Sequence, residues 1–193
     1  MQQGNLSSGL ESYRFAFAIT EHLAQADPGD AGLQSDLSTS HLRIAEVLLA
    51  QGKLSAALER YCASLAVAEP LARADPGNGR WQKNLSLVHA WMGDVFRSQD
   101  NLAAALENYR ISLALAERLA NADPANFAGQ RELALGHGRI GVVLAREGSQ
   151  RDAVAVLKQG HAILLRLRQQ APGDAALPTD LAWFEERMAE LKK

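Results

Sequence analysis

Cysteine, aromatic residues and long apolar runs are all scarce in this sequence. The single cysteine, Cys62, cannot form a disulfide framework, so packing and hydrogen bonds must hold the fold. Aromatic residues make up 6% of the chain while alanine and leucine are abundant, a composition typical of packed helices rather than strands. No apolar run approaches the roughly 20 residues that a membrane-spanning helix needs. We therefore expect a helical protein without a membrane span.

The sequence also lacks an excess of charge of either sign. Its 20 Lys and Arg residues nearly balance its 22 Asp and Glu residues, and the formal net charge is −2. Surfaces that bind nucleic acid or anionic membranes usually need a basic excess, so we expect neither partner. The first residues contain neither the basic stretch nor the apolar stretch of a secretory signal. A cytoplasmic location is the resulting expectation.

Sequence signatures of catalysis are missing as well. The chain has no GxGxxG, Walker-type loop, GxSxG or HExxH. Gly136-His137-Gly138 falls inside a helical pattern, so we do not expect a phosphate-binding loop there. Carboxylates are scattered rather than paired for acid–base work. We predict that the chain is not an enzyme and has neither catalytic residues nor a cofactor.

What the sequence does contain is an internal repeat. Four prolines in matching contexts are spaced 48 residues apart: Pro28, Pro76, Pro124 and Pro172. After each proline, a large apolar residue recurs at the same spacing: Ile44, Met92, Ile140 and Met188. Small residues directly follow these positions: Ala45, Gly93, Gly141 and Ala189. A column of small residues predicts helices that cross at close range.

Each 48-residue unit is predicted to form two helices, here called its first and second helix. In the second full unit, Leu85, Val88, Met92 and Val95 have the spacing of one helix face over about 78–98, and a second helix follows over about 102–122. Turns such as those at Gly52 and Gly148 separate the helices. An Asp-Pro pair ends each second helix, because the residue before proline disfavours helical geometry.

The repeat predicts an all-α fold, a right-handed α-solenoid of about eight helices stacked as antiparallel pairs. We expect a single repeat domain over 1–193: a half-repeat at 1–28, repeats at 29–76, 77–124 and 125–172, and a capping helix at 173–193. Pro70 lies inside a second helix and is expected to kink or break it. One residue before each first helix is well placed to cap it through a side-chain oxygen: Asp30, Asn78, Asn126 and Asp174.

The pattern resembles the tetratricopeptide repeat family. The resemblance rests on a large-small pair in the first helix and an Ala-aromatic-small series in the second, as in Met92-Gly93 followed by Ala105, Tyr109 and Ser112. It covers nearly the whole chain. The usual repeat has about 34 residues, so this chain resembles a long-helix variant with a 48-residue period.

The resemblance implies a protein–protein interaction scaffold whose first helices line a concave groove. The groove would bind a peptide or helix of a partner protein. On this pattern the partner-binding positions are Thr39, Leu42, Glu46, Leu87, Asp94, Arg97, Leu135 and Arg146.

The N-terminal helix supports an alternative function. Tyr13, Phe15 and Phe17 make it apolar although no first helix precedes it in this sequence. This end predicts either a missing upstream domain or self-association through these three residues. By self-association the chain would form a homodimer or act as the structural or oligomerisation segment of a larger multidomain bacterial signalling protein.

The remaining candidates for chemistry are histidines and Cys62. His41, His89 and His137 form a column, but equivalent atoms of successive repeats should lie roughly 8–10 Å apart, too far to share a metal ion. We predict no metal site and half-buried rings hydrogen-bonded to neighbouring helices. Cys62 shares a column with Arg14, Arg110 and Lys158, so we expect an exposed, inert thiol.

Overall fold

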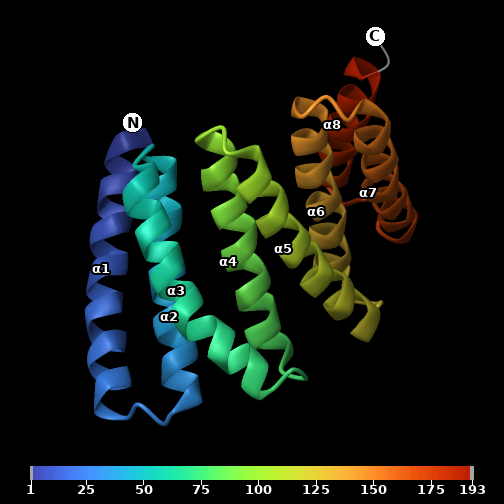
Figure 1. Cartoon of the computed structure of the whole chain (residues 1–193). Helices are drawn as coiled ribbons and strands as arrows, with labels where there is room; N and C mark the ends of the chain where they lie inside the picture. The colour runs from blue at the N-terminus through green and yellow to red at the C-terminus, as the bar shows by residue number, and fades with distance from the viewer. Residues whose placement is uncertain (1, 192–193) are drawn as a thin grey trace. The chain divides into compact units, whose positions relative to one another are not determined.

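The computed structural model describes residues 2–191, with side chains described from residue 8 onward, and every regular element in that range is an α-helix (Figure 1). The eight helices are α1 (Gln2–Ala26), α2 (Ala31–Ala50), α3 (Leu54–Ala74), α4 (Gly79–Ser98), α5 (Leu102–Ala122), α6 (Phe127–Arg146), α7 (Gln150–Gln170) and α8 (Leu177–Glu190). The predicted all-α solenoid of stacked helices is confirmed. Among the described residues, no helix combines the length and the apolarity required to cross a membrane.

The helices follow the 48-residue spacing of the sequence. The first helices α2, α4 and α6 each contain 20 residues, and the second helices α3, α5 and α7 each contain 21. Their starting residues are 48 apart within each set: Ala31, Gly79 and Phe127, then Leu54, Leu102 and Gln150. By the same spacing, α1 is a second helix and α8 is a first helix.

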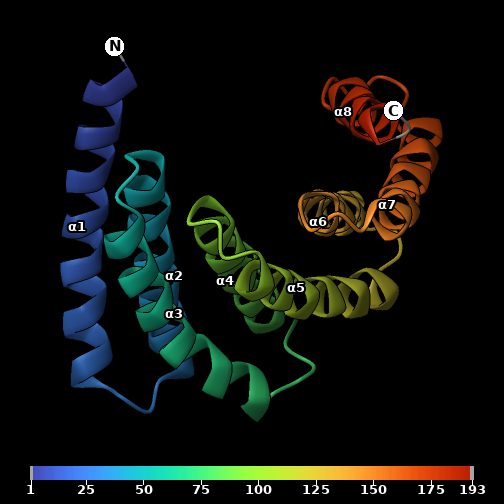
Figure 2. The ribbon, with the colours of Figure 1, turned by 45° about the horizontal axis from the view of Figure 1, so that its top comes forward.

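The chain divides into two compact units, Met1–Asp100 and Asn101–Lys193, called unit 1 and unit 2 below. In unit 1, α2 and α3 form the closest pair, α1 packs against α2, and α4 packs against α3 (Figures 1 and 2). In unit 2, α6 and α7 form the closest pair, α5 packs against α6, and α8 packs against α7. Each unit therefore buries its apolar faces by stacking consecutive antiparallel helices.

The N-termini of the first helices α2, α4 and α6 are capped by side chains, as predicted. Asp30 accepts hydrogen bonds from the backbone amides of Gly32 and Leu33 at 2.7 and 3.0 Å. Asn78 and Asn126 each accept one, at 3.2 and 2.9 Å. These bonds satisfy amides that have no partner inside the helix.

The prediction for Asp174 is only partly correct. Its carboxylate accepts hydrogen bonds from the amides of Ala176 and Leu177, at 2.9 and 3.1 Å. However, α8 begins at Leu177 with Ala176 as its cap residue, and a proline occupies its first turn. Asp174 therefore stabilises the turn that leads into α8 and does not cap the helix directly.

The turns between paired helices all use one left-handed residue. Gly52, Asp100 and Gly148, which are 48 residues apart, have φ angles of 72°, 62° and 83°. Glycine adopts this conformation without steric cost, and aspartate is among the few other residues that tolerate it. The glycine turns were predicted, whereas Asp100 shows that the turn geometry is kept without glycine.

The small-residue column allows paired helices to approach closely. Ala45 on α2 is fully buried, and so are Ala57 and Tyr61 on α3. On α6, a Cβ added to Gly141 would lie 2.6 Å from Cγ of Leu157 on α7. A larger residue in this column would push the two helices apart, as expected from the sequence.

Repeated glutamines join the second helices α1, α3 and α5 to the first helices that follow them. The side-chain amides of Gln34, Gln82 and Gln130 donate to the backbone carbonyls of Ala24, Ala72 and Ala120 at 3.1, 2.7 and 2.9 Å. These carbonyls lie near helix ends, where intrahelical partners run out. The glutamine column was not among the predicted features.

Pro70 does not break α3, which continues to Ala74. The helix instead changes direction in its C-terminal part (Figure 2). Proline lacks the amide hydrogen that would bond to the carbonyl of Ala66, so a bend is the expected local response.

Candidate protein-interaction surfaces

The predicted partner-binding residues of unit 1 lie on α2 and α4, which contact each other. Thr39, Glu46, Leu87, Asp94 and Arg97 are all half-buried. We call these five positions together with Trp91 the first-helix face of unit 1.

Leu42 does not belong to this face. It is 1% exposed and lies in the core cluster with Ile44, Ala45 and Tyr61. Its side chain packs inside the unit rather than lining an open surface, so we leave it out of the partner-binding set.

Trp91 is the residue of this face that the sequence interpretation missed. It is half-buried, packs against the core of unit 1, and lies one turn after Leu87 and one turn before Asp94. Residues spaced by three and four positions share a helix face, which was the available signal. The face thus combines an apolar pair, Leu87 and Trp91, with polar neighbours.

Ion pairs lie on both helices of this face. Arg43 contacts Glu46 at 2.9 Å on α2, and Arg97 contacts Asp94 at 3.1 Å on α4. Both pairs join residues three positions apart on one helix, where exposed pairs contribute little to stability. The face presents groups of both charge signs rather than a basic clamp for a carboxylate.

In unit 2, Leu135 is half-buried and Arg146 is exposed on α6. Between them, Gly138 allows α8 to approach: an added Cβ would lie 3.0 Å from the Trp183 ring and 2.9 Å from Phe184. Trp183, half-buried and edge-on to Phe184, therefore lies beside α6 and extends the apolar part of the unit 2 surface.

His41 and His137 of the histidine column pack among neighbouring side chains. Nδ1 of His41 lies 3.5 Å from the Arg60 guanidinium on α3, and its ring centroid is 4.7 Å from that of Phe17. Burial, followed by the nearby Arg60 charge, lowers the pKa of His41 to about 4. Burial also lowers the pKa of His137, whose Nδ1 has no hydrogen-bond partner among the described residues. The expected bond to a neighbouring helix is thus a long contact at His41 and is not seen at this atom of His137.

Chemistry-bearing side chains do not gather elsewhere in the described part of the chain. Within residues 2–191, no group of three or more His, Cys, Asp or Glu residues could hold a metal ion. Cys62 is exposed, as predicted.

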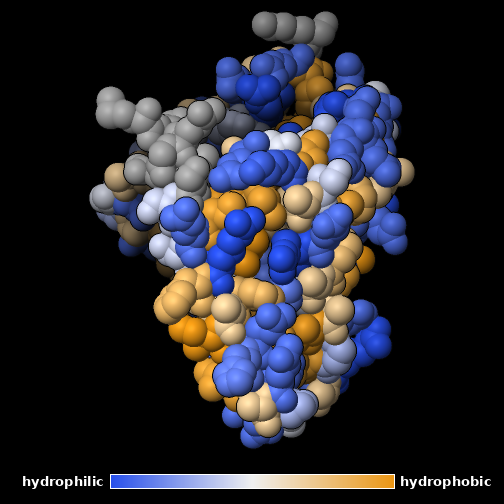
Figure 3. All heavy atoms as spheres, turned by 90° about the vertical axis from the view of Figure 1, so that its left-hand side faces the viewer, coloured by the Kyte–Doolittle hydropathy of each residue, from blue (hydrophilic) through white to orange (hydrophobic). Residues whose placement is uncertain are grey.

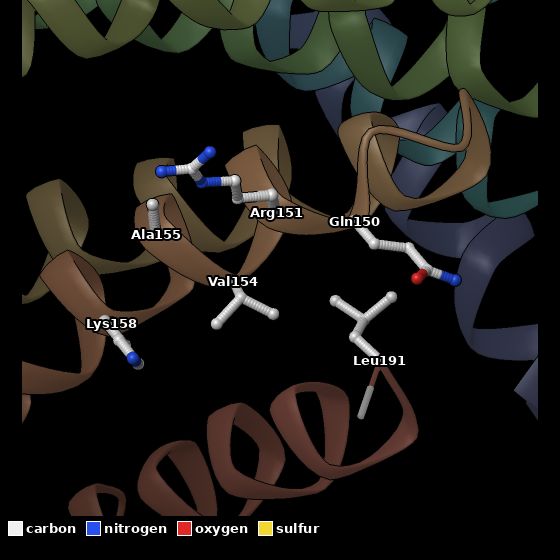
Figure 4. A pocket seen from close by; sticks show the side chains of 6 residues that line it. All are labelled: Gln150, Arg151, Val154, Ala155, Lys158 and Leu191. Atoms are coloured by element: carbon white, nitrogen blue, oxygen red, sulfur yellow. The ribbon is translucent and has the colours of Figure 1, made fainter. Parts of the chain in front are cut away.

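A surface pocket of about 510 Å³ lies between α7 and the end of α8. Figure 4 shows Val154 and Leu191 pointing toward each other across it, with Gln150 beside them. Arg151, Ala155 and Lys158 complete the lining. This lining offers an apolar pair, an amide and two cations, but no carboxylate or nucleophile for catalysis.

The three residues of α1 predicted for self-association do not all lie on its exposed surface. Tyr13 is 40% exposed and Phe15 is 72% exposed. Phe17 points inward: it packs against the core of unit 1, and Arg60 lies 5.2 Å from its ring centroid. Phe17 therefore belongs to the contact between α1 and its neighbours, whereas Tyr13 and Phe15 remain on the surface.

Comparisons with known proteins support the fold. No family model and no curated protein matches the sequence. The chain is similar to the crystal structure of BtubC (BKLC) from P. vanneervenii, with a TM-score of 0.65 and 15% identity over 96% of this chain and 82% of that one. MamA AMB-1 has a TM-score of 0.41 and 18% identity, covering 98% of this chain and 81% of that one. The designed helical repeat protein DHR64 has a TM-score of 0.38 and 13% identity, covering 100% and 99%. At these identities the likeness concerns the helical fold alone.

Proposed function

We propose that this chain is a protein-interaction scaffold related to tetratricopeptide repeats, and that it acts by binding rather than by catalysis. The observation that carries the proposal is the half-buried apolar pair Leu87 and Trp91 on the first-helix face. One ion pair lies on each of the two helices that form this face. Rigid stacked helices present such a face without reordering, which limits the entropy lost on binding.

The chemistry of this face favours a peptide or helix with apolar anchor residues. Leu87 and Trp91 would contact the anchors, and buried tryptophans are common centres of binding energy. Glu46, Asp94, Arg97 and Thr39 offer acceptors and donors for a polar rim. In unit 2, Leu135, Arg146 and Trp183 would make comparable contacts. The proposed scaffold works in the cytoplasm.

Photo-crosslinking from position 87 in the native cell, followed by titration with the purified partner, tests the proposal. Trp91→Ala should weaken binding by about tenfold or more, since truncating a central aromatic residue commonly costs 2 kcal/mol or more, as an order of magnitude. Leu87→Asp should have a comparable effect.

Ile111→Asp is the matched control, because Ile111 is an exposed apolar residue on the second helix α5 and not on a first-helix face. Its affinity should equal that of the wild type. If Trp91→Ala and Leu87→Asp bind the partner as tightly as Ile111→Asp does, the face is wrongly assigned.

A second candidate function is self-association through α1, for which the exposed apolar residues Tyr13, Ile19 and Leu23 are the specific observation. Such a segment would serve oligomerisation in a larger signalling protein. This association would use residues outside the first-helix face.

A further inference from the structure

One side of α1 exposes apolar residues along several turns. Ile19 is 49% exposed and Leu23 is 45% exposed, and Tyr13 and Ala16 are exposed on the same side. Figure 3, which views the molecule from the α1 side, shows hydrophobic side chains between hydrophilic ones. We call Tyr13, Ala16, Ile19 and Leu23 the open face of α1.

The same repeat positions are covered in α7. The residues three periods further along the chain are Leu157, Gly160, Ile163 and Leu167, and all four are buried. Ile163 is 7% exposed and Leu167 is 3% exposed, although their counterparts on α1 are half exposed. Residue type does not explain this difference, because Ile19 and Ile163 occupy the same repeat position, and so do Leu23 and Leu167.

The neighbouring helices explain it. Within unit 2, α7 packs against both α6 and α8, whereas within unit 1, α1 packs against α2, the counterpart of α8. The contact that α7 has in addition is with α6, the first helix of its own pair. There, a Cβ added to Gly160 would lie 2.7 Å from the carbonyl oxygen of Ala134. The open face of α1 is therefore the surface on which a first helix packs.

Unit 1 shows the same pairing between α2 and α3. Ser64 occupies the same repeat position as Ala16. Its hydroxyl shares a hydrogen bond with the Ser38 hydroxyl at 2.9 Å and donates a second one to the Ser38 carbonyl at 2.8 Å. Both serines are buried. The columns of residues 38 and 16 thus meet both between α2 and α3 and between α6 and α7.

The opposite half of such a pair is exposed on α8. This first helix packs on α7 through Leu177, Leu181 and Phe184, which are buried. Ala182 and Ala189 are exposed on α8. The residues at the repeat position of Ala182, Ser38 and Ala134, are buried, and so are those at the repeat position of Ala189, Ala45 and Gly141. α8 therefore offers the small-residue surface that normally receives the second helix of its pair.

The charged residues beside this surface already have partners. Glu185 lies 3.2 Å from His161, and Glu186 lies 3.0 Å from Arg187. Their carboxylates therefore border the small-residue surface while paired within their own chain.

We propose that α8 of one copy packs on the open face of α1 of a second copy, so that the two helices complete a first-helix and second-helix pair. By the contacts seen within the chain, Tyr13 would lie over Ala189, as Leu157 lies over Gly141, and Ala16 would lie beside Ala182. The two surfaces differ, so the association is heterologous, and each added copy leaves another α1 or α8 surface open. This association is independent of the proposed function of the first-helix face.

Disulfide trapping between full-length variants tests this pairing. In a Cys62→Ser background, Ala16→Cys and Ala182→Cys chains are purified separately, mixed and oxidised. We expect the mixed dimer to dominate, and we expect reductant to reverse it. Arg14→Cys mixed with Ala182→Cys is the control, because Arg14 is exposed two residues away in the column of the exposed Cys62. The Ala16→Cys mixture should exceed this control severalfold.

Two outcomes would overturn the proposal. A homodimer of Ala16→Cys chains that dominates over the mixed dimer would show that α1 pairs with a second α1. Equal trapping in the Ala16→Cys and Arg14→Cys mixtures would show that the surfaces do not meet.

Sedimentation of otherwise unmodified protein gives a second readout. The mean mass of the wild type should rise with concentration, and Ile19→Glu should return it to that of the monomer. Phe15→Glu should leave the association unchanged, because Phe15, although 72% exposed, corresponds to the exposed Gln159 of α7. If Phe15→Glu and Ile19→Glu act alike, general stickiness rather than the proposed pairing causes association.

Discussion

The helices α1 and α7 occupy the same place in the repeat, yet one exposes the face that the other buries. Ile19 and Ile163 have the same chemistry and the same repeat position, and their exposed fractions are 49% and 7%. The difference comes from the first helix α6, which packs on α7 and has no described counterpart on α1. In a repeat protein, the energetic weight of a residue thus depends on the neighbouring helix as much as on its own column.

The largest expected effect is a matched truncation of the two isoleucines. Ile163→Ala should lower the free energy of unfolding by about 2–4 kcal/mol, because it removes buried methylene groups and leaves a cavity. Ile19→Ala should change it by less than about 0.5 kcal/mol, as is usual for exposed positions. Urea unfolding at low protein concentration measures both, and comparable losses would contradict the difference between the two helices.

A smaller effect is expected from adding one methyl group to glycines of the same two helices. Gly160→Ala should destabilise by about 1–3 kcal/mol, because the new Cβ would meet the Ala134 carbonyl at 2.7 Å and the Phe184 ring. Gly9→Ala should stabilise by up to about 1 kcal/mol, since nothing lies within 4 Å and alanine favours the helix. Thermal unfolding of each variant provides the measurement, and effects of equal sign would count against the account.

The glutamine contacts permit a similar contrast within unit 1. Gln82→Ala should cost about 1–2 kcal/mol, because its buried side chain donates at 2.7 Å to the Ala72 carbonyl, which would lose its partner. Gln34→Ala should cost less, roughly 0.5–1 kcal/mol, because Gln34 is only half-buried and its bond is 3.1 Å long. Chemical unfolding ranks the two, and the reverse order would show that burial does not set the strength of these contacts.

A further prediction, of similar size, concerns pH. The pKa of His41 is lowered from 6.5 to about 4 in the folded chain, so its ring stays neutral where the unfolded chain takes up a proton. The contribution of the neutral His41 ring to the free energy of unfolding is therefore fully present above about pH 6.5 and is lost as the pH falls toward 4. The loss should be on the order of 1 kcal/mol once solvent screening of a partly exposed ring is considered. His41→Phe should remove this part of the melting-temperature profile, and an unchanged profile would exclude His41 as its source.

The sequence predicted the helices and turns well because their signals are local. The prolines, the cap residues Asp30, Asn78 and Asn126, and the glycines of the turns act within a few residues of their own positions. The 48-residue spacing then multiplied each signal. Asp100 departs from the glycine pattern but keeps the left-handed turn, which aspartate tolerates.

The surfaces were harder to predict because they depend on neighbouring helices. Phe15 and Phe17 lie on opposite sides of α1, and the positions of α2 and α3 determine which of the two packs inward. Leu42 shares a column with small residues of other repeats, which concealed its role in the core. Trp91 was not predicted, although it lies between Leu87 and Asp94 on the same helix. The glutamines recur at the 48-residue spacing, but their hydrogen-bond partners are backbone carbonyls, which the sequence does not display.

The most direct test of the difference between α1 and α7 is the reactivity of a thiol at the two matched positions. In a Cys62→Ser background, Ile19→Cys and Ile163→Cys are treated with a water-soluble thiol reagent under native conditions. The thiol at position 19 should react at nearly the rate of the unfolded chain in dilute protein, and the thiol at position 163 should be strongly protected. Equal rates at the two positions would contradict the claim that a neighbouring first helix covers this face in α7 and not in α1.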